Sequence, residues 1–394
     1  MSKSPYDGLQ SVLADAGSAH GLPNPHYVSD VVFAKESKAV LFDNWTGVGF
    51  TSDVPNPGDV RPVNLLGMPL LLVRTYDGEI KVFQNTCRHR GMLLVQKPGN
   101  VRKVVRCPYH SWCYDLHGKL QVTPHVGGPG CNQHESINPE QLGLHQIDCA
   151  HWLGVIFVNI SAKAPPFDQY SAKLQQRWCE FGDLEIHGDP DSTFTLQVRT
   201  NWKLAVENYC ESYHLPWVHP GLNSYSKLED HYNIEQPDSF SGQGSLVYRQ
   251  LRTADGQTLE DLGSLSESWD TGSEYIALYP NVLLGVHRDH TFAIVLEPQS
   301  THETVERVAL FYSKESANNI AYKKLREENK DLWKAVFEED IFVVEGMQSG
   351  RQGVLFDGGV FSPIMDSPTH NFHRWVANQL LAATPTYGNQ SLQG

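Results

Sequence analysis

Two histidines and an acidic residue lie close together in the stretch 201–220 and could bind a metal ion. His214 and His219 are five positions apart, and Glu211 and Asn208 precede the first histidine by three and six positions. Imidazole is the commonest protein metal ligand, and an acid just upstream can tune a metal site or connect it to another group. Two histidines at this spacing also occur by chance, so the alternative is a pair of structural histidines.

Cysteine and histidine also occur in two mixed pairs near the N-terminus. Cys87 is paired with His89 and Cys107 with His110, with seventeen residues between the pairs. Two thiolates and two imidazoles could bind a structural zinc ion, which is the main alternative. Zinc fingers, however, place their cysteines together and their histidines together, whereas each pair here supplies one of each. That distribution suits a two-iron cluster in which one iron is bound by sulfur and the other by nitrogen.

The two pairs resemble the cluster-binding loops of Rieske [2Fe-2S] domains. The motif C-R-H-R-G begins at Cys87 and the motif C-P-Y-H-S-W begins at Cys107, and both match the loops of that family. The resemblance implies that the two cysteines bind the inner iron, and that His89 and His110 bind the outer iron. Histidine ligation raises the reduction potential of such a cluster.

Most of the chain resembles the catalytic α subunit of Rieske non-haem iron oxygenases, the ring-hydroxylating family. The motifs N-W-K from Asn201 and N-x2-[D/E]-x2-H-x4-H match its catalytic segment. The motif E-D-I-x-x-x-E-x-x-Q from Glu339 matches its late carboxylate motif. The resemblance implies that His214, His219 and Asp340 bind a mononuclear Fe(II).

Such a ligand set agrees with oxygenase chemistry. Two histidines and one carboxylate occupy one face of an octahedral Fe(II) and leave the opposite face open for O2 beside the substrate. Two electrons are needed per turnover, and a Rieske cluster supplies them one at a time, which explains two metal sites in one chain. The alternative class is a Rieske electron carrier, which the long C-terminal domain with its histidines and Asp340 disfavours. Iron content separates the two, with about three irons per chain for an oxygenase and about two for a carrier.

Glu211 departs from the family pattern, because Asp is common at this position. In the family this carboxylate bridges the mononuclear site to a Rieske histidine of the neighbouring subunit. The resemblance therefore implies a contact between Glu211 and His110 of another copy, within a ring-shaped oligomer such as a homotrimer. The glutamate looks like the variant in oxygenases of quaternary ammonium compounds such as carnitine, choline and glycine betaine. Alternatively it is a local variation without meaning for the substrate. Asn208 joins Glu211 as a candidate catalytic residue.

The resemblance thus implies a terminal oxygenase component that hydroxylates or N-demethylates a small quaternary ammonium compound. A trimethylammonium group cannot be hydrogen-bonded and is held by aromatic faces. The same rings would equally line a pocket for a flat molecule, so hydroxylation or O-demethylation of an aromatic compound is the alternative. The aromatic candidates flank or follow the histidine motif: Tyr209, Tyr213, Trp217, Tyr232, Tyr248, Tyr275 and Tyr279.

The sequence contains no G-x-G-x-x-G dinucleotide motif and no ferredoxin-type cysteine cluster. A separate NAD(P)H-dependent reductase with flavin and iron–sulfur centres is therefore expected to supply the electrons. The net charge of −14 argues against nucleic-acid or membrane-surface binding and favours a partner with a basic docking face. There is no apolar run of membrane-span length and no signal-peptide core. Seven scattered cysteines do not suggest a disulfide framework, so we expect a cytoplasmic protein.

The elements that position these residues belong to an α+β chain. Residues 1–40 are expected to form an N-terminal arm, and 41–165 an antiparallel β Rieske domain with a hairpin turn at Asp77-Gly78. Residues 166–394 are expected to form the catalytic iron domain, an antiparallel sheet covered by helices. A helix should begin near Trp202 and end either before Pro216, with His214 inside it, or before Pro220, with both histidines inside it. A long helix within 315–350 should carry Asp340. Strands are expected in this domain at 193–198, 245–250, 275–279, 282–286, 292–298 and 304–313.

Overall fold

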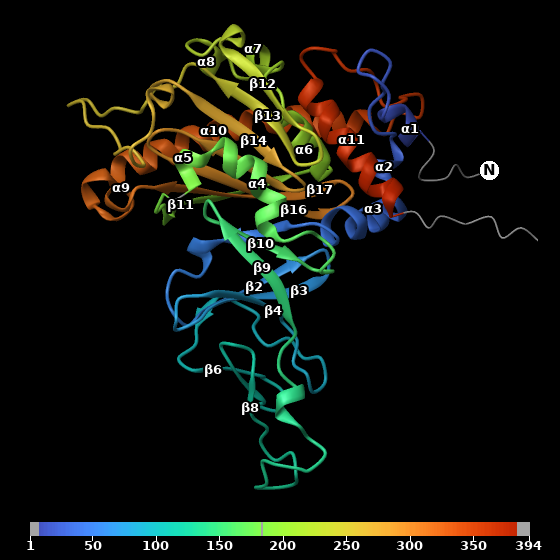
Figure 1. The fold of residues 1–394 in the computed structure, drawn as a ribbon, viewed down its shortest axis with the longest axis vertical. Coiled ribbons are helices and arrows are strands. Elements are labelled where there is room, and N and C mark those ends of the chain that lie inside the picture. The colour runs from blue at the N-terminus through green and yellow to red at the C-terminus, as the bar shows by residue number, and fades with distance from the viewer. Residues whose placement is uncertain (1–7, 183, 384–394) are drawn as a thin grey trace, which may run out of the picture.

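The computed structural model describes residues 8–182 and 184–383. These residues form two antiparallel sheets of seven strands each and a third sheet of three strands. Figure 1 shows the two large sheets one above the other, with most of the helices gathered around the upper one. The predicted α+β class, with a β-rich N-terminal domain followed by a helix-covered antiparallel sheet, is confirmed. The division of the chain at residues 40 and 165 stays a prediction.

The sheet of the N-terminal domain has the order β1-β10-β9-β4-β3-β2-β5. The turn between β3 and β4 contains Asp77 and Gly78, as predicted. Gly78 has φ +87°, a conformation that residues with a Cβ rarely adopt, so glycine fits this tight turn. The strands of this sheet are β1 (Thr46–Phe50), β2 (Asp59–Leu65), β3 (Met68–Arg74), β4 (Ile80–Gln84), β5 (Gly99–Asn100), β9 (Gln146–Trp152) and β10 (Val155–Asn159).

The three-stranded sheet lies at the lower end of the molecule in Figure 1, where β6 and β8 are labelled. It consists of β6 (Val104–Arg106), β7 (Cys113–Asp115) and β8 (Leu120–Val122). Cys107 directly follows β6, so this small sheet holds one of the two cysteine–histidine segments.

The second large sheet has the order β11-β17-β16-β15-β14-β13-β12. One predicted strand is wrong, because β13 ends at Ser245 and residues 246–272 form a loop with one short helical turn. The strands are β11 (His187–Val198), β12 (His231–Gln236), β13 (Phe240–Ser245), β14 (Ser273–Leu278), β15 (Val282–Val286), β16 (Thr291–Ser300) and β17 (Glu303–Tyr312).

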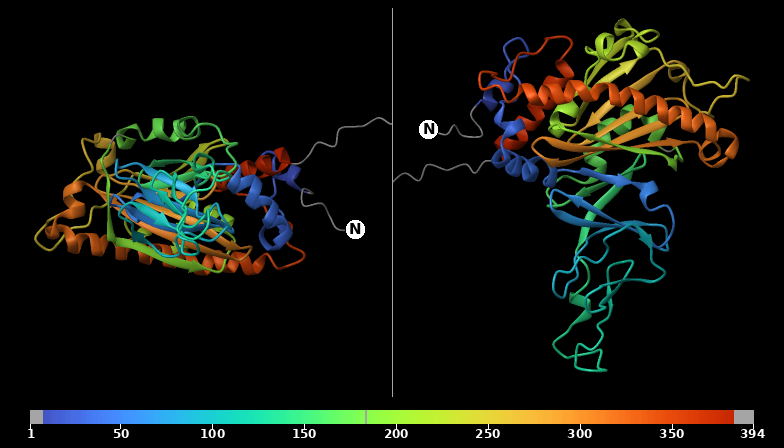
Figure 2. Two further views of the ribbon diagram at one scale, coloured as in Figure 1. Left: turned by 90° about the horizontal axis from the view of Figure 1, so that it is seen from below. Right: turned by 180° about the vertical axis from the view of Figure 1, so that it is seen from behind.

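Helices cover this sheet on both faces. Figure 2 shows the long helix α10 and the green helices α4 and α5 on opposite sides of it. The α-helices are α1 (Leu9–Val12), α2 (Pro25–Val28), α3 (Asp30–Glu36), α4 (Phe167–Arg177), α5 (Cys179–Gly182), α6 (Trp202–Tyr209), α7 (Leu215–Val218), α8 (Pro220–Asn223), α9 (Lys314–Asn318), α10 (Lys323–Gly350) and α11 (Ser367–Ala382). The other helical segments are η1 (Ser37–Phe42), η2 (Thr51–Asp53), η3 (Pro139–Gln141), η4 (Leu228–Asp230), η5 (Glu267–Asp270) and η6 (Ile320–Tyr322).

The main hydrophobic core lies between the catalytic sheet and helices α6, α10 and α11. It contains Val206 of α6, Trp333 of α10 and Phe372 of α11, packed with Leu283 and Ile294 of the sheet. Burying apolar side chains of this size contributes roughly 1.5–3 kcal/mol each. This core fixes α6 and α10 relative to each other, and these two helices lead into the predicted metal ligands.

The N-terminal arm packs against the back of α6. Lys203 of α6 is fully buried, and its Nζ lies 2.6 Å from Glu36 Oε2 at the end of α3. His26 in α2 completes this group, with its Nδ1 2.5 Å from the other oxygen of the same carboxylate. Buried charges persist only when they are paired, so the arm stabilises the position of α6.

Two buried contacts join the domains. The Asn281 side chain, between β14 and β15, donates to the carbonyl oxygen of Gly47 in β1 and accepts from its N–H, both at 2.9 Å. Arg307 of β17 donates to Asp53 after β1, with 2.6 Å between Nη2 and Oδ1. All three side chains are largely removed from solvent, so the orientation of the domains is held by directional contacts.

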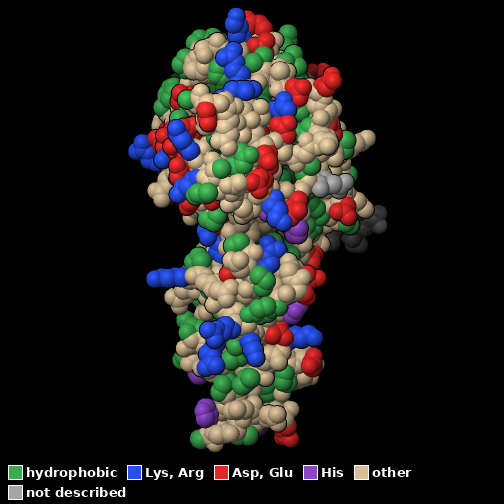
Figure 3. Space-filling view, turned by 90° about the vertical axis from the view of Figure 1, so that its left-hand side faces the viewer, with side chains coloured by type: hydrophobic (Ala, Val, Ile, Leu, Met, Phe, Trp, Pro, Cys, Tyr) green, Lys and Arg blue, Asp and Glu red, His purple; other side chains and the backbone are tan. Residues whose placement is uncertain are grey.

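Charge is unevenly distributed over the surface. Figure 3 shows Lys and Arg side chains gathered on the lower, N-terminal domain. Residues 86–122, which include both cysteine–histidine segments, contain seven Lys or Arg residues and one acidic residue. The expectation of a basic partner face, drawn from the net charge, therefore does not apply to this tip, which favours an acidic surface. No helix within residues 8–182 and 184–383 has both the length and the apolar character of a membrane span.

Candidate metal centres and substrate pocket

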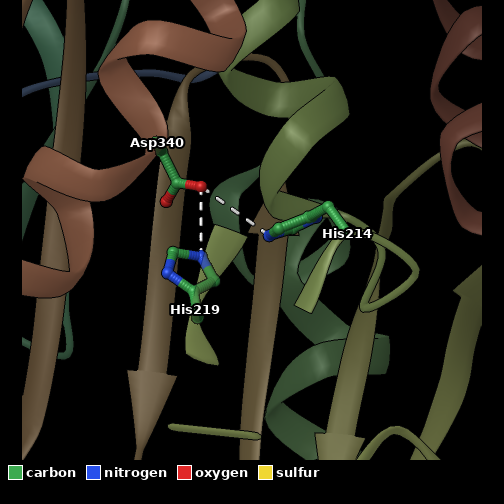
Figure 4. Close-up of side chains that lie close together, drawn as sticks. All are labelled: His214, His219 and Asp340. Carbon is green, nitrogen blue, oxygen red and sulfur yellow. Dashed lines mark ion pairs between the residues drawn. The ribbon is translucent and has the colours of Figure 1, made fainter. Parts of the chain in front are cut away.

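His214, His219 and Asp340 converge at one point, as Figure 4 shows. The Oδ1 atom of Asp340 lies 3.1 Å from Nε2 of His219 and 3.7 Å from Nε2 of His214. One ligand atom from each side chain lies within 4.8 Å of the others. The structure therefore brings together the three residues that the motifs predict as iron ligands.

A break in the helix positions the histidines. The expectation that one continuous helix holds one or both of them is wrong. Helix α6 ends at Tyr209, and the four-residue helix α7 begins only at Leu215. His214 and His219 precede and follow α7 directly. A residue next to a helix end has freer backbone angles than one inside, which allows both imidazoles to turn toward α10.

A second carboxylate contacts each histidine on its far nitrogen. His214 Nδ1 lies 2.8 Å from Glu211 Oε1, and His219 Nδ1 lies 2.7 Å from Glu339 Oε2. Such contacts fix the tautomer, because a proton on Nδ1 leaves Nε2 with the lone pair that faces Asp340. Glu211 is itself held by the backbone N–H groups of Tyr213 and His214. The contact of Glu339 was not predicted, although this residue directly precedes Asp340 in the motif.

The donor set fits a divalent iron. Asp340 Oδ1 is buried and has no hydrogen-bond partner among the described residues, although it faces two imidazoles. Burial opposes protonation of His219, but the carboxylates of Asp340 and Glu339 outweigh it and raise its pKa. A cation at the shared point would satisfy the orphaned oxygen and take the place of that proton. Two histidines and a carboxylate are the ligands of non-haem Fe(II) sites.

The two cysteine–histidine segments form matching loops. In each loop the cysteine N–H donates to a carbonyl five residues later, at Met92 and Trp112, with both distances 2.8 Å. In each loop the cysteine carbonyl also accepts from the N–H four residues later, at 3.0 Å. The residues that donate to these carbonyls, Gly91 and Ser111, both have positive φ. Two loops with this shared turn present two equivalent cysteine–histidine pairs.

The side chains of these loops fit a cluster bound by sulfur and nitrogen. The rings of His89 and His110 lie 4.7 Å apart, and Trp112 stacks on His89 at 4.8 Å. Both cysteines are buried, and burial raises the pKa of the Cys87 thiol. Burial lowers the pKa of His89, which favours the neutral imidazole that binds metals. The buried Nδ1 of His110 has no hydrogen-bond partner within the described ranges.

A pocket of about 100 Å³ opens on the predicted iron ligands His214, His219 and Asp340. Its walls include Asn208, one of the predicted catalytic residues, and Gln243, whose side chain donates to the Glu211 carbonyl at 3.3 Å. The aromatic rings of its walls are Tyr209, Tyr225, Tyr248, Tyr275, Phe292, Trp333 and Phe337.

Three of the aromatic residues singled out from the sequence, Tyr209, Tyr248 and Tyr275, line this pocket. Tyr213, Trp217 and Tyr232 are exposed, and Tyr279 is buried in the core, where its hydroxyl donates to Ser241.

A buried carboxylate lies behind the aromatic wall. Asp289 Oδ1 is 2.7 Å from the hydroxyl of Tyr248 and 2.8 Å from Nδ1 of His290. The indole N–H of Trp333 donates to the other ring nitrogen of His290 at 2.8 Å. Because an indole N–H can only donate, His290 carries its proton on Nδ1 and donates to Asp289. Burial and then the charge of Asp289 raise the pKa of Tyr248. Tyr248 and Trp333 are therefore fixed around an anionic group.

The two candidate metal centres lie toward opposite ends of the folded molecule. Figure 1 shows β6 and β8, beside the cysteine–histidine loops, at the lower end, and α7, between the two histidine ligands, at the upper end. Both seven-stranded sheets lie between them. The chain by itself does not bring the centres together.

Comparisons with known proteins agree with these sites. The Rieske [2Fe-2S] domain family matches residues 44–136, and the catalytic domain of the ring hydroxylating alpha subunit matches residues 183–382. The glycine betaine monooxygenase oxygenase subunit of Chromohalobacter salexigens is 26% identical, and the alignment covers 95% of this chain and 89% of that protein.

Solved structures share the fold. A crystal structure of a quaternary ammonium Rieske monooxygenase with L-carnitine has a TM-score of 0.75 at 21% identity and covers 96% of this chain and 99% of its own. Naphthalene 1,2-dioxygenase from Rhodococcus sp. bound to indole has a TM-score of 0.77 at 17% identity, with the same coverage of 96% and 99%. At these identities the likeness shows the fold alone. From its two matching domains, the chain belongs to the ring-hydroxylating alpha subunit family and is a Rieske-type oxygenase with a [2Fe-2S] cluster and a mononuclear non-haem iron.

Proposed function

We propose that this chain is a terminal oxygenase component that hydroxylates or N-demethylates a small quaternary ammonium compound. The observation that carries the proposal is the aromatic pocket on the iron ligands, with the buried Asp289 behind it. In this proposal His214, His219 and Asp340 hold the mononuclear iron. The [2Fe-2S] cluster is held by four residues of the lower tip: Cys87, His89, Cys107 and His110.

The pocket is suited to a permanent cation. A quaternary ammonium group offers no hydrogen-bond donor, so its recognition depends on π faces and on nearby negative charge. Tyr248, Tyr275 and Trp333 supply rings, and Tyr248 is hydrogen-bonded to the carboxylate of Asp289. A neutral aromatic substrate would gain from the rings but not from Asp289. The carboxylate therefore favours the cation over the flat aromatic alternative.

The side chains around the ligands orient the reaction. Bound iron supplies the activation of O2 and the transfer of one oxygen atom to a substrate C–H bond. Glu211 and Glu339 hold the imidazoles of His214 and His219, so that their Nε2 atoms face Asp340. The pocket walls place the substrate methyl groups beside these ligands and exclude bulk water from them.

The overall reaction balances with two external electrons. One oxygen atom of O2 enters a C–H bond of an N-methyl group, and the other leaves as water with two electrons and two protons. The resulting N–CH2–OH group breaks its C–N bond and releases formaldehyde, a tertiary amine and a proton. Hydroxylation at another carbon next to nitrogen would release a longer aldehyde in the same way.

The electrons are proposed to pass between copies of the chain. The cluster of one copy would dock where Glu211 lies, and Glu211 would connect His214 to His110 of the neighbouring copy. Support comes from the opposite placement of the two centres and from the exposed aromatic side chains Tyr213 and Trp217 beside Glu211. A closed ring, such as a homotrimer, satisfies this contact for every copy. Members of this family take their electrons from a separate reductase, here proposed to be a flavin and iron–sulfur protein that uses NAD(P)H.

Substrate-dependent O2 uptake with a surrogate reductase tests the proposal. Glycine betaine, carnitine and choline are compared with aromatic acids, and released aldehyde is measured alongside O2. We expect coupled uptake with at least one trimethylammonium compound, and no NADH consumption by the purified chain without reductase. Coupled turnover of aromatic acids, with none of the ammonium compounds active, would instead support the aromatic alternative.

A further inference from the structure

Arg249 is the only Lys or Arg side chain in the wall of the substrate pocket, within the described part of the chain. It lies in the loop after β13, which also supplies Val247, Tyr248 and Leu251 to the wall. Arg249 is exposed, whereas Asp340, the only acidic residue of the wall, is half-buried beside the buried His219. The pocket thus has a cationic group near its mouth and the iron ligands further inside.

The guanidinium of Arg249 lies over an aromatic ring. Its Cζ atom lies 4.8 Å from the centre of the Tyr225 ring, and Tyr225 is itself part of the pocket wall. A cation–π contact occupies none of the five N–H donors of a guanidinium with a conventional hydrogen bond, so these donors stay available to a ligand. Within residues 8–182 and 184–383, no carboxylate lies within ion-pair distance of Arg249, and no hydrogen bond to its donors is formed.

This arrangement suits a ligand that carries its own carboxylate. An oriented guanidinium with free edge donors binds a carboxylate through two parallel hydrogen bonds, which fix both its position and its direction. The one carboxylate of the pocket wall, Asp340, is committed to the iron site. A substrate carboxylate would therefore pair with Arg249 without competition from a carboxylate of the pocket wall.

We propose that Arg249 binds the carboxylate of a zwitterionic quaternary ammonium substrate, a betaine, at the mouth of the pocket. This inference rests on the proposed function and narrows its substrate class. With the carboxylate held at the mouth, the trimethylammonium end points inward to the rings of Tyr248 and Trp333. The N-methyl groups, and not the carbon chain, then face the iron ligands, so formaldehyde is the expected aldehyde.

The test compares glycine betaine with choline, which carries a hydroxymethyl group in place of the carboxylate. Their Kd values are measured by calorimetry on the anaerobic holoenzyme, and KM and kcat from aldehyde release with a surrogate reductase. In Arg249→Gln we expect the Kd and KM for glycine betaine to rise roughly 10- to 100-fold, as for a lost charge-assisted pair. The kcat for glycine betaine and all constants for choline should change less than about 3-fold.

Arg252→Gln is the matched control, because Arg252 is exposed in the same loop and does not line the pocket. It should leave both compounds unaffected. Equal effects of Arg249→Gln on the two compounds, or no effect on either, would overturn the role of Arg249. Turnover of a trimethylammonium compound in that case would still support the proposed function. If glycine betaine, choline and carnitine all fail to bind and to be turned over by the unaltered enzyme, both proposals fail. A longer aldehyde in place of formaldehyde would overturn the inward orientation of the methyl groups.

Discussion

Glu306 allows a quantitative prediction. It is a buried acid beside the predicted iron site, and no Lys or Arg of the described residues forms an ion pair with it. It lies on β17, is 9% exposed, and lines a small cavity together with Asn208 and Asp340. Burial, and then the charge of Asp340, raise its pKa to about 8. In the iron-free protein Glu306 is therefore protonated near neutral pH, whereas in the unfolded chain it is ionised above about pH 4.5.

The sign and the size of the effect follow from linkage. The pKa of Glu306 is higher in the folded protein than in the unfolded chain. Its contribution to the free energy of unfolding is therefore fully present below about pH 4.5 and is lost as the pH rises to about 8. Each pH unit in this window costs about 1.4 kcal/mol, so the whole window costs at most about 5 kcal/mol. Glu306→Gln keeps the shape of the side chain and cannot ionise, so the variant should lack this loss.

The assay is urea unfolding of iron-free protein at pH 5, 6, 7 and 8, followed by tryptophan fluorescence. The variant and the unaltered protein should be similar near pH 5, and the variant should be more stable by several kcal/mol at pH 8. Glu303→Gln, on the same strand but exposed, is the control and should show no such difference. Iron bound at Asp340 should lower the pKa of Glu306 and reduce the gap. Parallel stability curves for Glu306→Gln and the unaltered protein would refute the reasoning.

Three further predictions test the site and the contacts between the domains. His214→Ala should lower the iron content from about three to about two per chain and abolish product formation while keeping the visible spectrum of the cluster; surviving activity would remove His214 from the ligand set. Glu211→Gln should keep both metals and slow single-turnover electron transfer about 10-fold or more in stopped-flow measurements, and an unchanged rate contradicts the bridge. Arg307→Met should lower the free energy of unfolding by about 1–3 kcal/mol, because it removes the closer cationic partner of the buried Asp53 and leaves only Arg61, 3.4 Å away. Adding Asp53→Asn should restore part of that loss, and a double variant as unstable as the single one would argue against a charge effect.

Much of the fold was predictable because its signals are local. The hairpin turn at Gly78 and the strands β15 and β16 follow from turn chemistry and β-branched runs. The convergence of His214, His219 and Asp340 was predictable because their motifs resemble those of a known family, which requires no knowledge of the fold.

The failures come from tertiary packing. Residues 245–250 have the composition of a strand, but the segment leaves the sheet after Ser245, and its side chains Val247 and Tyr248 line the pocket wall. The helix expected to end before Pro216 or Pro220 stops at Tyr209, and a separate short helix begins at Leu215. The contact of Glu339 with His219 and the placement of Asp289 behind Tyr248 join segments far apart in sequence. Local patterns carry no information on such contacts.

The rigid joint between the domains affects how activity depends on protein concentration. Asn281 and Arg307 hold the N-terminal domain in one orientation, so its cluster cannot swing toward the iron of its own chain. In a lone subunit, an electron donor can therefore reduce the cluster, but no mononuclear iron lies close enough to accept the electron. Under the proposed electron route, dilution below the dissociation constant of the oligomer would stop product formation and leave reduction of the cluster intact. The working unit of catalysis would then be a contact between two chains.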